Sequence, residues 1–381
     1  MTKVYLVRHA EAEGNLYRRV HGHYDSSLTL TGQKQVQMLA KRFEDIPVDA
    51  VYSSDLKRTM QTAQAIYLQK NLPLNTMPSL REYNLGDWED CEWGYLAFEG
   101  SQDYKNWENH HYKCVVPNGD DVYKVSERMT KTIRELAQKH KDGNIALFSH
   151  GAAIRSALCT FMDIKFEKIE SVGWADNTAV ALLLIDDDGN VIIEYKNDSS
   201  HLDTDKTAPV RKRWWEQGLD MDSYNLWFKP VDIVEDRELI KKYQRDAFFT
   251  VWGSLRLFDN KIAFAKTKKM VQFNPKSVVF AMQKGNPVGI VELDGNNLDY
   301  GNNGHIALFY LLEDLCGIGF GAQLLGYAVS FYRRLGRQSL TLRVARNNLR
   351  GLAFYKKHGF YEIDREDTPM EQLYVMKKDL D

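Results

Sequence analysis

The residues of the first half of the chain that could do chemistry stand directly after short apolar segments. Arg8 and His9 follow one such segment, and His150 follows another. If both segments are strands of one parallel sheet, their carboxyl ends open onto the same crevice, where the two histidines can meet. Arg58 stands early in a predicted helix and brings a second guanidinium to that edge. Two arginines and two histidines in one crevice suit a phosphoryl group, because guanidinium forks match its oxygens.

The second half of the chain holds a glycine-rich run between an apolar segment and a predicted helix. The run is Gly317-Ile318-Gly319-Phe320-Gly321-Ala322. Closely spaced glycines at this place expose backbone N–H groups at the positive end of a helix, which suits a pyrophosphate. An ordinary turn has a similar composition, so the run is a weak signal by itself. A dinucleotide-binding fold is disfavoured, because no second strand–helix–strand unit follows the run.

The elements that must position the first set of residues alternate between strand and helix. The pattern runs through 4–7, 32–42, 50–52, 56–68, 145–148 and 152–161. This alternation predicts a parallel α/β sheet. Two further strands, at 179–185 and 191–195, are joined by a polar turn and should close the first domain near residue 203.

A chain of 381 residues predicts two domains. We place one at 1–203, a linker at 204–223, and the second at 224–381. We interpret the pair Trp214-Trp215 in the linker as side chains that fill a domain interface. The alternative is a basic aromatic patch that binds nucleic acid.

Composition excludes several classes of protein. With 44% hydrophobic and 27% charged residues, the chain is an ordinary globular protein. Its apolar runs are far shorter than the ~20 residues of a bilayer span, and it starts without a signal-peptide pattern. We therefore expect a cytoplasmic protein with no membrane association.

Neither metal nor nucleic acid is predicted as a partner. The four cysteines are scattered without CxxC spacing, so no metal site is expected. From residue 224 onward there are 23 Lys and Arg against 18 Asp and Glu, but these charges are dispersed. A solvated face explains them better than a nucleic-acid surface, although a cationic surface also suits a polyanionic cofactor.

Four ordered motifs in the first domain resemble the histidine phosphatase superfamily, in its phosphoglycerate-mutase-like branch. They are Val7-Arg8-His9-Ala10-Glu11-Ala12-Glu13-Gly14-Asn15, Ser53-Ser54-Asp55-Leu56-Lys57-Arg58-Thr59-Met60-Gln61-Thr62-Ala63, Leu80-Arg81-Glu82 and Ser149-His150-Gly151. The resemblance implies a three-layer α/β fold. It also implies that His9 is the nucleophile and becomes phosphohistidine, and that Glu82 is the general acid and later the base. In the same way it assigns the phosphate oxygens to Arg8, Arg58 and His150, with Asn15 nearby.

Two positions depart from that family pattern. Ala10 stands where the family usually has Gly, and Ala12 where it usually has Thr. The first change is harmless if φ is negative there. The second removes a hydroxyl that normally helps to line the phosphate pocket, so a lower activity or an unusual substrate is expected.

The region between Glu82 and Pro117 bears on the reaction and on the substrate. Mutases of the family carry a longer insertion there, so the short region here favours a phosphatase. The region is also rich in aromatic and acidic residues. We interpret it as a helical lid that packs its rings on the sheet, with a cap that selects an apolar or aromatic phosphomonoester as the alternative.

The second half resembles the GNAT N-acetyltransferase family. The resemblance rests on the glycine run, on the central strand 288–293, and on Asn347-Asn348-Leu349-Arg350-Gly351-Leu352-Ala353-Phe354-Tyr355 after a strand at 339–344. It implies an α+β fold in which acetyl-CoA, used as co-substrate, lies between two splayed parallel strands of a mixed sheet. The amine acceptor and the phosphate ester are not identified by the sequence.

The same resemblance implies the cofactor-binding residues. The pantetheine amides would pair with the strand near Leu311, and the pyrophosphate would lie on the amides of 317–322. Asn348 and Tyr355 would line the groove, and Tyr355 would protonate the departing thiolate. Their simpler roles are a helix cap and a packed ring. Cys316 departs from the family's usual Arg or Gln, so weakened affinity is expected. Glu292 and His305 are both candidates for the base, with a water chain as a third possibility.

The leading hypothesis is therefore a bifunctional enzyme that hydrolyses a phosphomonoester and acetylates an amine. One alternative makes the second domain an acyl-CoA sensor that regulates the phosphatase without turnover. The other is a phosphoglycerate mutase with an accessory domain.

Overall fold

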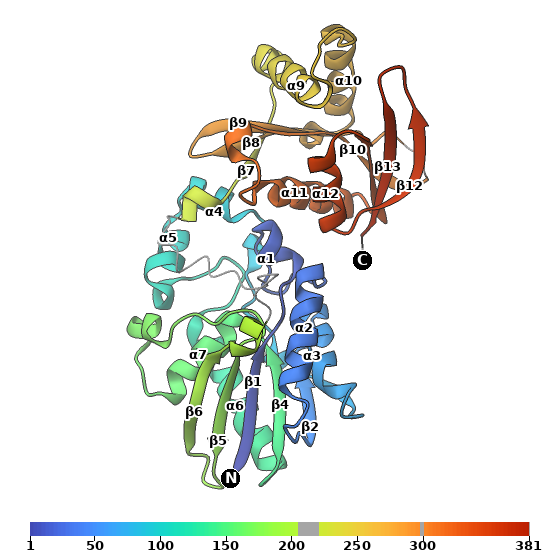
Figure 1. Ribbon diagram of the computed structural model, residues 1–381. Coiled ribbons are helices and arrows are strands. Elements are labelled where there is room, and N and C mark those ends of the chain that lie inside the picture. Colours follow the sequence, from blue (N-terminus) through green and yellow to red (C-terminus); the bar gives the residue numbers. More distant parts are fainter. Residues whose placement is uncertain (205–220, 298–300, 381) are drawn as a thin grey trace. The chain divides into compact units, whose positions relative to one another are not determined.

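The computed structural model describes residues 1–204, 221–297 and 301–380 (Figure 1). These residues form two compact units. The first holds Met1–Cys91 and the described residues from Glu99 to Thr204, and the second holds Glu92–Phe98 and the described residues from Met221 onward. Most of the predicted linker, including Trp214-Trp215, lies outside the described residues.

A six-stranded mixed sheet forms the middle of the first unit, in the order β3-β2-β4-β1-β5-β6. The strands β3, β2, β4 and β1 run parallel to one another, and β5 and β6 are antiparallel strands at one edge. The strands are β1 (Thr2–Arg8), β2 (Ala50–Ser53), β3 (Leu74–Thr76), β4 (Asn144–Ser149), β5 (Val180–Ile185) and β6 (Val191–Asp198). The predicted parallel sheet and its closing hairpin are confirmed.

Helices cover both faces of this sheet. The helices of this part of the chain are α1 (Glu13–Tyr17), α2 (Leu30–Arg42), α3 (Lys57–Tyr67), α4 (Trp93–Glu99), α5 (Gln102–Asn109), α6 (Val122–Lys139) and α7 (Gly151–Phe161). Side chains of α2 and α3 share a core with Tyr5 and Val7 of β1. Thr2 points the other way and donates to the carbonyl of Ala137 in α6. Because side chains alternate along a strand, α6 lies on the opposite face, and the predicted three layers are confirmed (Figure 1).

The aromatic region after Glu82 is partly packed core. Tyr83, Trp88 and Tyr104 are buried, and Trp107 meets the first two edge to face. Edge-to-face packing is a favoured arrangement for such rings. Phe98 belongs to the second unit, in which it stacks on Trp227 with ring centroids 4.0 Å apart. The interpretation that these rings serve packing therefore holds for the buried rings of this region.

The second unit is built on a seven-stranded mixed sheet, in the order β12-β13-β11-β10-β9-β8-β7. Its strands are β7 (Trp227–Pro230), β8 (Val278–Gln283), β9 (Asn286–Leu293), β10 (Asn303–Leu311), β11 (Ser339–Ala345), β12 (Tyr361–Asp367) and β13 (Gln372–Asp379). Its helices are α8 (Met221–Tyr224), α9 (Arg237–Trp252), α10 (Asn260–Phe273), α11 (Phe320–Arg334) and α12 (Leu349–Lys357). The predicted mixed sheet is confirmed.

The parallel pair β10 and β11 separates partway along its length. The two strands pair only from Asn303 to Ile306 on β10, against Ser339 to Leu342 on β11. The register with β9 is irregular just beyond, between Ile306 and Leu308. Such an irregularity bends a strand. The rest of β10 therefore leaves β11, and its backbone groups on that side have no strand partner.

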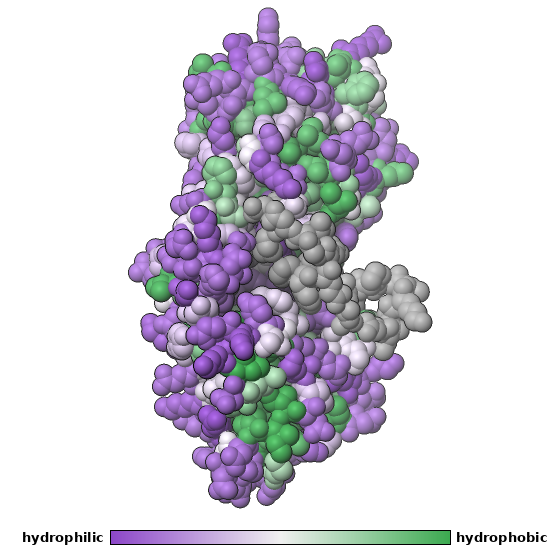
Figure 2. Space-filling view, turned by 90° about the vertical axis from the view of Figure 1, so that its left-hand side faces the viewer, coloured by the Kyte–Doolittle hydropathy of each residue, from purple (hydrophilic) through white to green (hydrophobic). Residues whose placement is uncertain are grey.

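The face drawn in Figure 2 is mostly hydrophilic, with hydrophobic side chains gathered in small groups. Among the residues that the structure describes, no helix has both the length and the apolar character needed to cross a bilayer.

Candidate active sites

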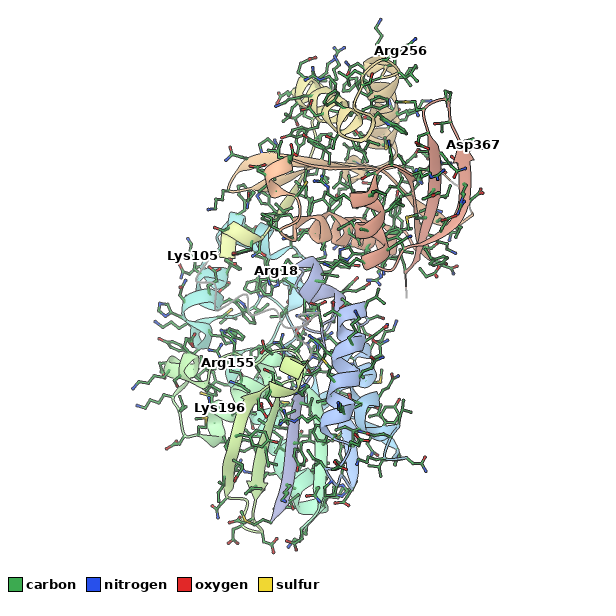
Figure 3. All side chains as sticks on the ribbon, viewed as in Figure 1. Arg18, Lys105, Arg155, Lys196, Arg256 and Asp367 are labelled. Atoms are coloured by element: carbon green, nitrogen blue, oxygen red, sulfur yellow. The ribbon has the colours of Figure 1, made fainter. Side chains whose placement is uncertain are left out.

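The carboxyl ends of the central strands of the first unit lie at one level. Arg8 at the end of β1 pairs with Ser149 at the end of β4, and Ser53 of β2 pairs with Phe148. The residues that follow, His9 and His150, are therefore neighbours, with ring centroids 5.3 Å apart. The structure brings the two predicted histidines together, as the parallel sheet requires. Figure 3 marks Arg18 after α1 and Arg155 on α7 at this end of the sheet.

The His9 ring is held in one orientation and one tautomer. Its Nδ1 lies 2.7 Å from the carbonyl oxygen of Ala10. A carbonyl accepts but does not donate, so Nδ1 carries the proton and Nε2 keeps a free lone pair. The backbone of His9 is fixed as well, because its carbonyl accepts from the side-chain amide of Asn177 at 2.9 Å. Nε2 is thus the atom that can attack an electrophile.

The surroundings keep His9 neutral. Its side chain is 3% exposed. Burial lowers the pKa of His9 well below its ordinary value, and the guanidiniums of Arg58 and Arg8 lower it further. Neutral imidazole is the nucleophilic form. The same cations that would hold a phosphate therefore also keep the nucleophile unprotonated.

Arg8 has a donor ready for an anion. Its Nη1 donates to the carbonyl of Ala175, while its Nε is buried and has no partner among the described residues. The guanidinium lies against Gly151 at the start of α7, where an added Cβ would stand 3.1 Å from Nε. A buried orphan donor is costly unless a ligand satisfies it. A phosphate oxygen fits this requirement.

Arg58 is fully buried and is held by the segment that follows α1. It donates to the carbonyls of His21 at 3.2 Å, Gly22 at 2.6 Å and Tyr24 at 3.0 Å. Its Nε donates to Nδ1 of His150 at 3.2 Å. Burial lowers the pKa of Arg58 to about 10, so it stays cationic at neutral pH.

His150 is positioned from both sides of its ring. Arginine only donates, so Nδ1 accepts from Arg58, and Nε2 therefore faces Ser54 Oγ at 2.8 Å as the donor. Ser54 comes directly after β2, which explains why that strand end belongs to the site. In this arrangement Arg58 and His150 form one hydrogen-bonded pair beside His9.

Glu82 stands at the amino end of α7. Its carboxylate accepts from the backbone N–H groups of Ala152 at 3.0 Å and Ala153 at 2.8 Å. These are first-turn amides that have no partner inside a helix. Glu82 also acts electrostatically on both arginines, because it opposes the lowering of the pKa of Arg8 and Arg58 by burial. The structure thus brings Glu82 to the same site as the arginines.

Sequence reasoning missed His21 and placed Asn15 only by resemblance. The His21 ring lies edge to face on His9 with centroids 5.7 Å apart, and its Nε2 is 3.2 Å from Asn15 Nδ2. The Oδ1 atom of Asn15 accepts from the N–H of Ala12 at 3.0 Å. His21 packs so closely on Gly14 that a Cβ there would overlap the ring. The repeated histidines at 21 and 23 were the available signal.

The two departures from the family pattern are both accommodated in the structure. The φ angle of Ala10 is not in the left-handed region, so a methyl group is tolerated, and its N–H donates to Thr62 Oγ1 at 2.9 Å. Ala12 precedes α1 as its N-terminal cap without a side-chain hydrogen bond. The condition that was set for Ala10 is met, and the missing hydroxyl at 12 remains a difference in the pocket.

Glu89 is a second residue that the sequence did not reveal. Its carboxylate accepts from four backbone N–H groups, those of Gly22, His23, Tyr24 and Leu85, at 2.6 to 3.0 Å. Three of the four belong to the segment whose carbonyls hold Arg58. Glu89 therefore fixes Arg58 from a distance, through the backbone between them.

In the second unit, the glycine run forms an open loop at the start of α11. Gly317 has φ +83° and Gly319 has φ +107°, conformations that favour glycine, and an added Cβ at either would meet nothing within 4 Å. Gly319 caps α11, whose first-turn N–H groups point out of the helix end. Open space beside first-turn amides at a helix end suits a pyrophosphate, although the N–H of Ala322 already donates to the carbonyl of Gly319 at 3.2 Å.

The position of Cys316 receives a guanidinium from elsewhere. Arg350 on α12 donates from Nη2 to Cys316 Sγ at 3.4 Å. A guanidinium from the neighbouring helix thus lies beside the position where the family usually has Arg or Gln, which spacing along the sequence did not indicate. The weakened affinity expected from Cys316 stays a prediction.

Asn348 and Tyr355 both lie on or beside α12. Asn348 caps the helix, since its Oδ1 accepts from the N–H of Gly351 at 2.9 Å. The ring of Tyr355 packs against Phe354 and Phe360, and burial raises the pKa of its hydroxyl. The simpler roles of both residues are thus present, and their roles toward acetyl-CoA stay predictions.

Metal ligation finds no support at either site. Within 1–204, 221–297 and 301–380, no group of three or more His, Cys, Asp or Glu side chains is gathered as a metal site requires. The cations of the first site are arginines. That neither reaction needs a metal stays a prediction.

Comparison with known proteins identifies both halves. A family model of the histidine phosphatase superfamily (branch 1) matches residues 4–198, and one of the acetyltransferase (GNAT) family matches residues 237–360. The chain therefore belongs to the histidine phosphatase superfamily and carries a GNAT acetyltransferase domain as well. The predicted fusion and the predicted enzyme classes are confirmed.

Individual relatives cover the first half. Phosphoserine phosphatase 1 of Hydrogenobacter thermophilus is 29% identical over 202 residues, which are 53% of this chain and 95% of that protein. Phosphoglycerate mutase-like protein 4 of Arabidopsis thaliana is 31% identical over 204 residues, 53% of this chain and 87% of that protein. The solved structure of Bacillus stearothermophilus YhfR superposes with a TM-score of 0.51 and 25% identity, over 53% of this chain and 99% of its own.

The first prediction concerns the protonation of His9. Because its pKa is lowered by burial and by two guanidiniums, the ring should stay neutral, with the proton on Nδ1, when the pH falls to 6. Nitrogen-15 NMR of the imidazole, with the signal assigned through His9→Asn, measures this directly. A protonation midpoint at or above the ordinary value of ~6.5 would contradict the electrostatic account.

The second prediction concerns Glu89. Glu89→Gln places an amide where four N–H groups need an acceptor, so the segment that holds Arg58 should loosen. We expect the free energy of unfolding to fall by about 1.5–3 kcal/mol and kcat/KM toward an aryl phosphate to fall more than about tenfold. Denaturant titration and steady-state kinetics measure both quantities.

Glu99→Gln is the matched control, because Glu99 is exposed and holds no such set of amides. If Glu89→Gln behaves like Glu99→Gln, the carboxylate does not hold the site.

Proposed function

We propose that this chain is a bifunctional enzyme. The first domain hydrolyses a small phosphomonoester through a phosphohistidine on His9, and the second transfers an acetyl group from acetyl-CoA to an amine. The observation that carries the first activity is the state of His9, which is buried, neutral and protonated on Nδ1, with a free Nε2 among cationic side chains.

In the first half-reaction, Nε2 of His9 attacks phosphorus and the bond from phosphorus to the ester oxygen breaks. Arg8 and Arg58 stabilise the charge that spreads over the equatorial oxygens. Glu82, in its protonated form, gives its proton to the departing alkoxide. The Arg58 guanidinium is already fixed at the site, because His150 and three backbone carbonyls accept its hydrogen bonds.

In the second half-reaction, water replaces the leaving group. The Glu82 carboxylate takes a proton from the water, whose oxygen attacks phosphorus, and inorganic phosphate and neutral His9 are released. The amides of Ala152 and Ala153 keep the carboxylate in one place for both proton transfers. Hydrolysis is favoured over mutase chemistry because the segment from Glu82 to Pro117 is short and its buried rings pack among themselves.

Acetyl transfer in the second domain is supported by the glycine loop and by the splayed strands. The loop from Gly317 to Ala322 would bind the pyrophosphate, and Arg350 adds a cation beside it. The free edge of β10 near Leu311 would pair with the pantetheine amides. Bound acetyl-CoA supplies a thioester that an amine can attack. Tyr355 of α12 would protonate the sulfur.

The third prediction tests the phosphatase. His9→Ala should abolish hydrolysis of p-nitrophenyl phosphate, because it removes the nitrogen proposed to carry the phosphoryl group. Release of inorganic phosphate from an unlabelled ester, without transfer between positions of one substrate, separates hydrolysis from mutase chemistry. Activity of His9→Ala within tenfold of the wild type would remove the phosphohistidine mechanism.

Glu82→Gln refines the same test. An aryl oxide leaves without help whereas an alkoxide needs a proton, so the variant should lose more activity on an alkyl phosphate than on an aryl phosphate. Equal losses on both would exclude Glu82 as the general acid.

The fourth prediction tests acetyl-CoA binding. A carboxylate at 319 would fill the open space above the loop and repel phosphates, so Gly319→Asp should abolish binding in calorimetric titration while aryl-phosphate hydrolysis is kept. Tyr355→Phe is the control, since its ring and packing stay and the dissociation constant should rise less than about tenfold, ~1.4 kcal/mol. Undiminished binding by Gly319→Asp would show that the loop does not hold the pyrophosphate.

A further inference from the structure

The helices α9 and α10, which pack on one face of the second sheet, form a hairpin with an ordered tip (Figure 1). Gly253 ends α9 in a left-handed conformation, and Asp259 precedes α10 as its N-cap. Between them, the N–H of Phe258 donates to the carbonyl of Leu255 at 3.0 Å. The ring of Phe258 packs on Phe248 with centroids 5.0 Å apart. Hydrogen bonds and ring packing therefore hold the turn at the tip.

Four large apolar side chains are exposed at this tip. Their exposed fractions are 54% for Phe249, 40% for Leu255, 57% for Leu257 and 58% for Ile262. An added Cβ at Gly253 would meet nothing within 4 Å, so the turn projects into open space. Figure 3 labels Arg256 in the same turn, on the side of the hairpin away from the sheet. A single exposed apolar side chain is ordinary, whereas several gathered at one turn indicate a contact surface.

The hairpin also carries a high positive charge. Residues 237–276 contain ten Lys and Arg against three Asp and Glu, a net charge of +7 in a chain whose net charge is −2. Its acidic side chains are engaged within the hairpin. Glu238 pairs with Lys241 at 3.0 Å and Asp246 with Arg245 at 3.4 Å. Asp259 accepts from the first N–H groups of α10, so none of the three neutralises the outer surface.

Six basic side chains of the hairpin are exposed and form no ion pair with any residue that the structure describes. They are Lys242, Arg256, Lys261, Lys266, Lys268 and Lys269. Lys266 and Lys269 are one helical turn apart, a spacing at which like charges repel. An anionic partner would remove this repulsion.

The apolar tip and the basic helices together fit the surface of an anionic lipid bilayer. Apolar side chains that project from a helix end can enter the boundary between headgroups and acyl chains, while basic side chains stay beside the phosphates. An acidic polypeptide would match the lysines equally well. It would not match the tip, because a partner helix needs a groove and these side chains project outward.

We propose that the tip of the α9–α10 hairpin docks the protein on the surface of anionic phospholipid membranes. Phe249, Leu255, Leu257 and Ile262 insert below the headgroups, and the basic side chains beside them contact the headgroup phosphates. The inference does not depend on the acetyl transfer proposed above. It revises the expectation that the protein has no membrane association, because that expectation rested on the length of apolar runs and not on what the fold exposes.

The two contributions make the attachment reversible and dependent on salt. Each basic side chain near an anionic surface increases the affinity roughly fivefold. This attraction is screened in about 0.5 M NaCl, where the Debye length is only ~4 Å. Insertion of the apolar side chains adds affinity that salt does not screen.

The fifth prediction tests the surface with the full-length protein and sedimented vesicles. The wild type should bind vesicles of phosphatidylglycerol and phosphatidylcholine in equal parts at least about tenfold more tightly than vesicles of pure phosphatidylcholine. Binding to the anionic vesicles should fall at least about tenfold in 0.5 M NaCl. The fraction of protein that sediments, measured against lipid concentration, gives both values.

Two double variants separate the contributions of charge and apolar insertion. Lys266→Gln with Lys269→Gln should weaken binding about 20-fold, because two cations leave the surface. Leu255→Gln with Leu257→Gln should weaken it more than about tenfold, because the inserted area becomes polar. Circular dichroism should find the helix content of both variants unchanged, since all four side chains are exposed.

The matched controls change the same residue types at exposed positions of the first unit. Lys165→Gln with Lys168→Gln is the control for charge, and Leu68→Gln with Ile192→Gln is the control for apolar surface. Both controls should bind the anionic vesicles within twofold of the wild type.

Each outcome decides the proposal. Equal binding to neutral and anionic vesicles, or no binding to either, would overturn it. So would hairpin variants that bind the anionic vesicles as tightly as their controls. If the wild type binds polyglutamate but not the anionic vesicles, the partner is an acidic polypeptide and the membrane proposal is wrong.

Discussion

The first site depends on a buried cation that is held entirely by backbone oxygens and one histidine. Arg58 has no exposed surface, and its donors end on the carbonyls of 21, 22 and 24 and on His150. Those carbonyls are in turn fixed because Glu89 accepts the N–H groups of the same short segment. The Glu89 carboxylate thus binds the N–H groups of this segment, and the Arg58 guanidinium binds its carbonyl groups. The charge is stabilised inside the protein before any phosphate arrives, which is the condition for electrostatic preorganisation.

The second unit depends on a different constraint, the separation of two parallel strands. A sheet normally satisfies its backbone groups by pairing. Between β10 and β11 the pairing ends at Ile306, and the backbone groups of β10 beyond it do not pair with β11. The open glycine loop continues the same edge to the start of α11. Neither feature needs a particular side chain.

The sequence predicted what depends on strand ends and glycines, and missed what depends on distant contacts. His9, His150 and Arg58 were predicted together because parallel strands align their carboxyl ends, which is a property of topology. The splayed pair and its glycine loop followed from the second family pattern. Glu89 was not predicted, since its role arises only when the segment that it holds is folded against it. Arg350 was missed for the same reason, because only the packing of α12 brings it to Cys316.

The two candidate sites are therefore built by opposite means, and this difference predicts where each tolerates change. The first site uses buried side-chain charges, and each charge needs hydrogen bonds that hold it in place. Loss of a residue such as Glu89 therefore affects the site through the backbone segment that holds Arg58. The second uses backbone amides, whose dipoles persist whatever the side chain, so only a change of backbone conformation or of free space disturbs them.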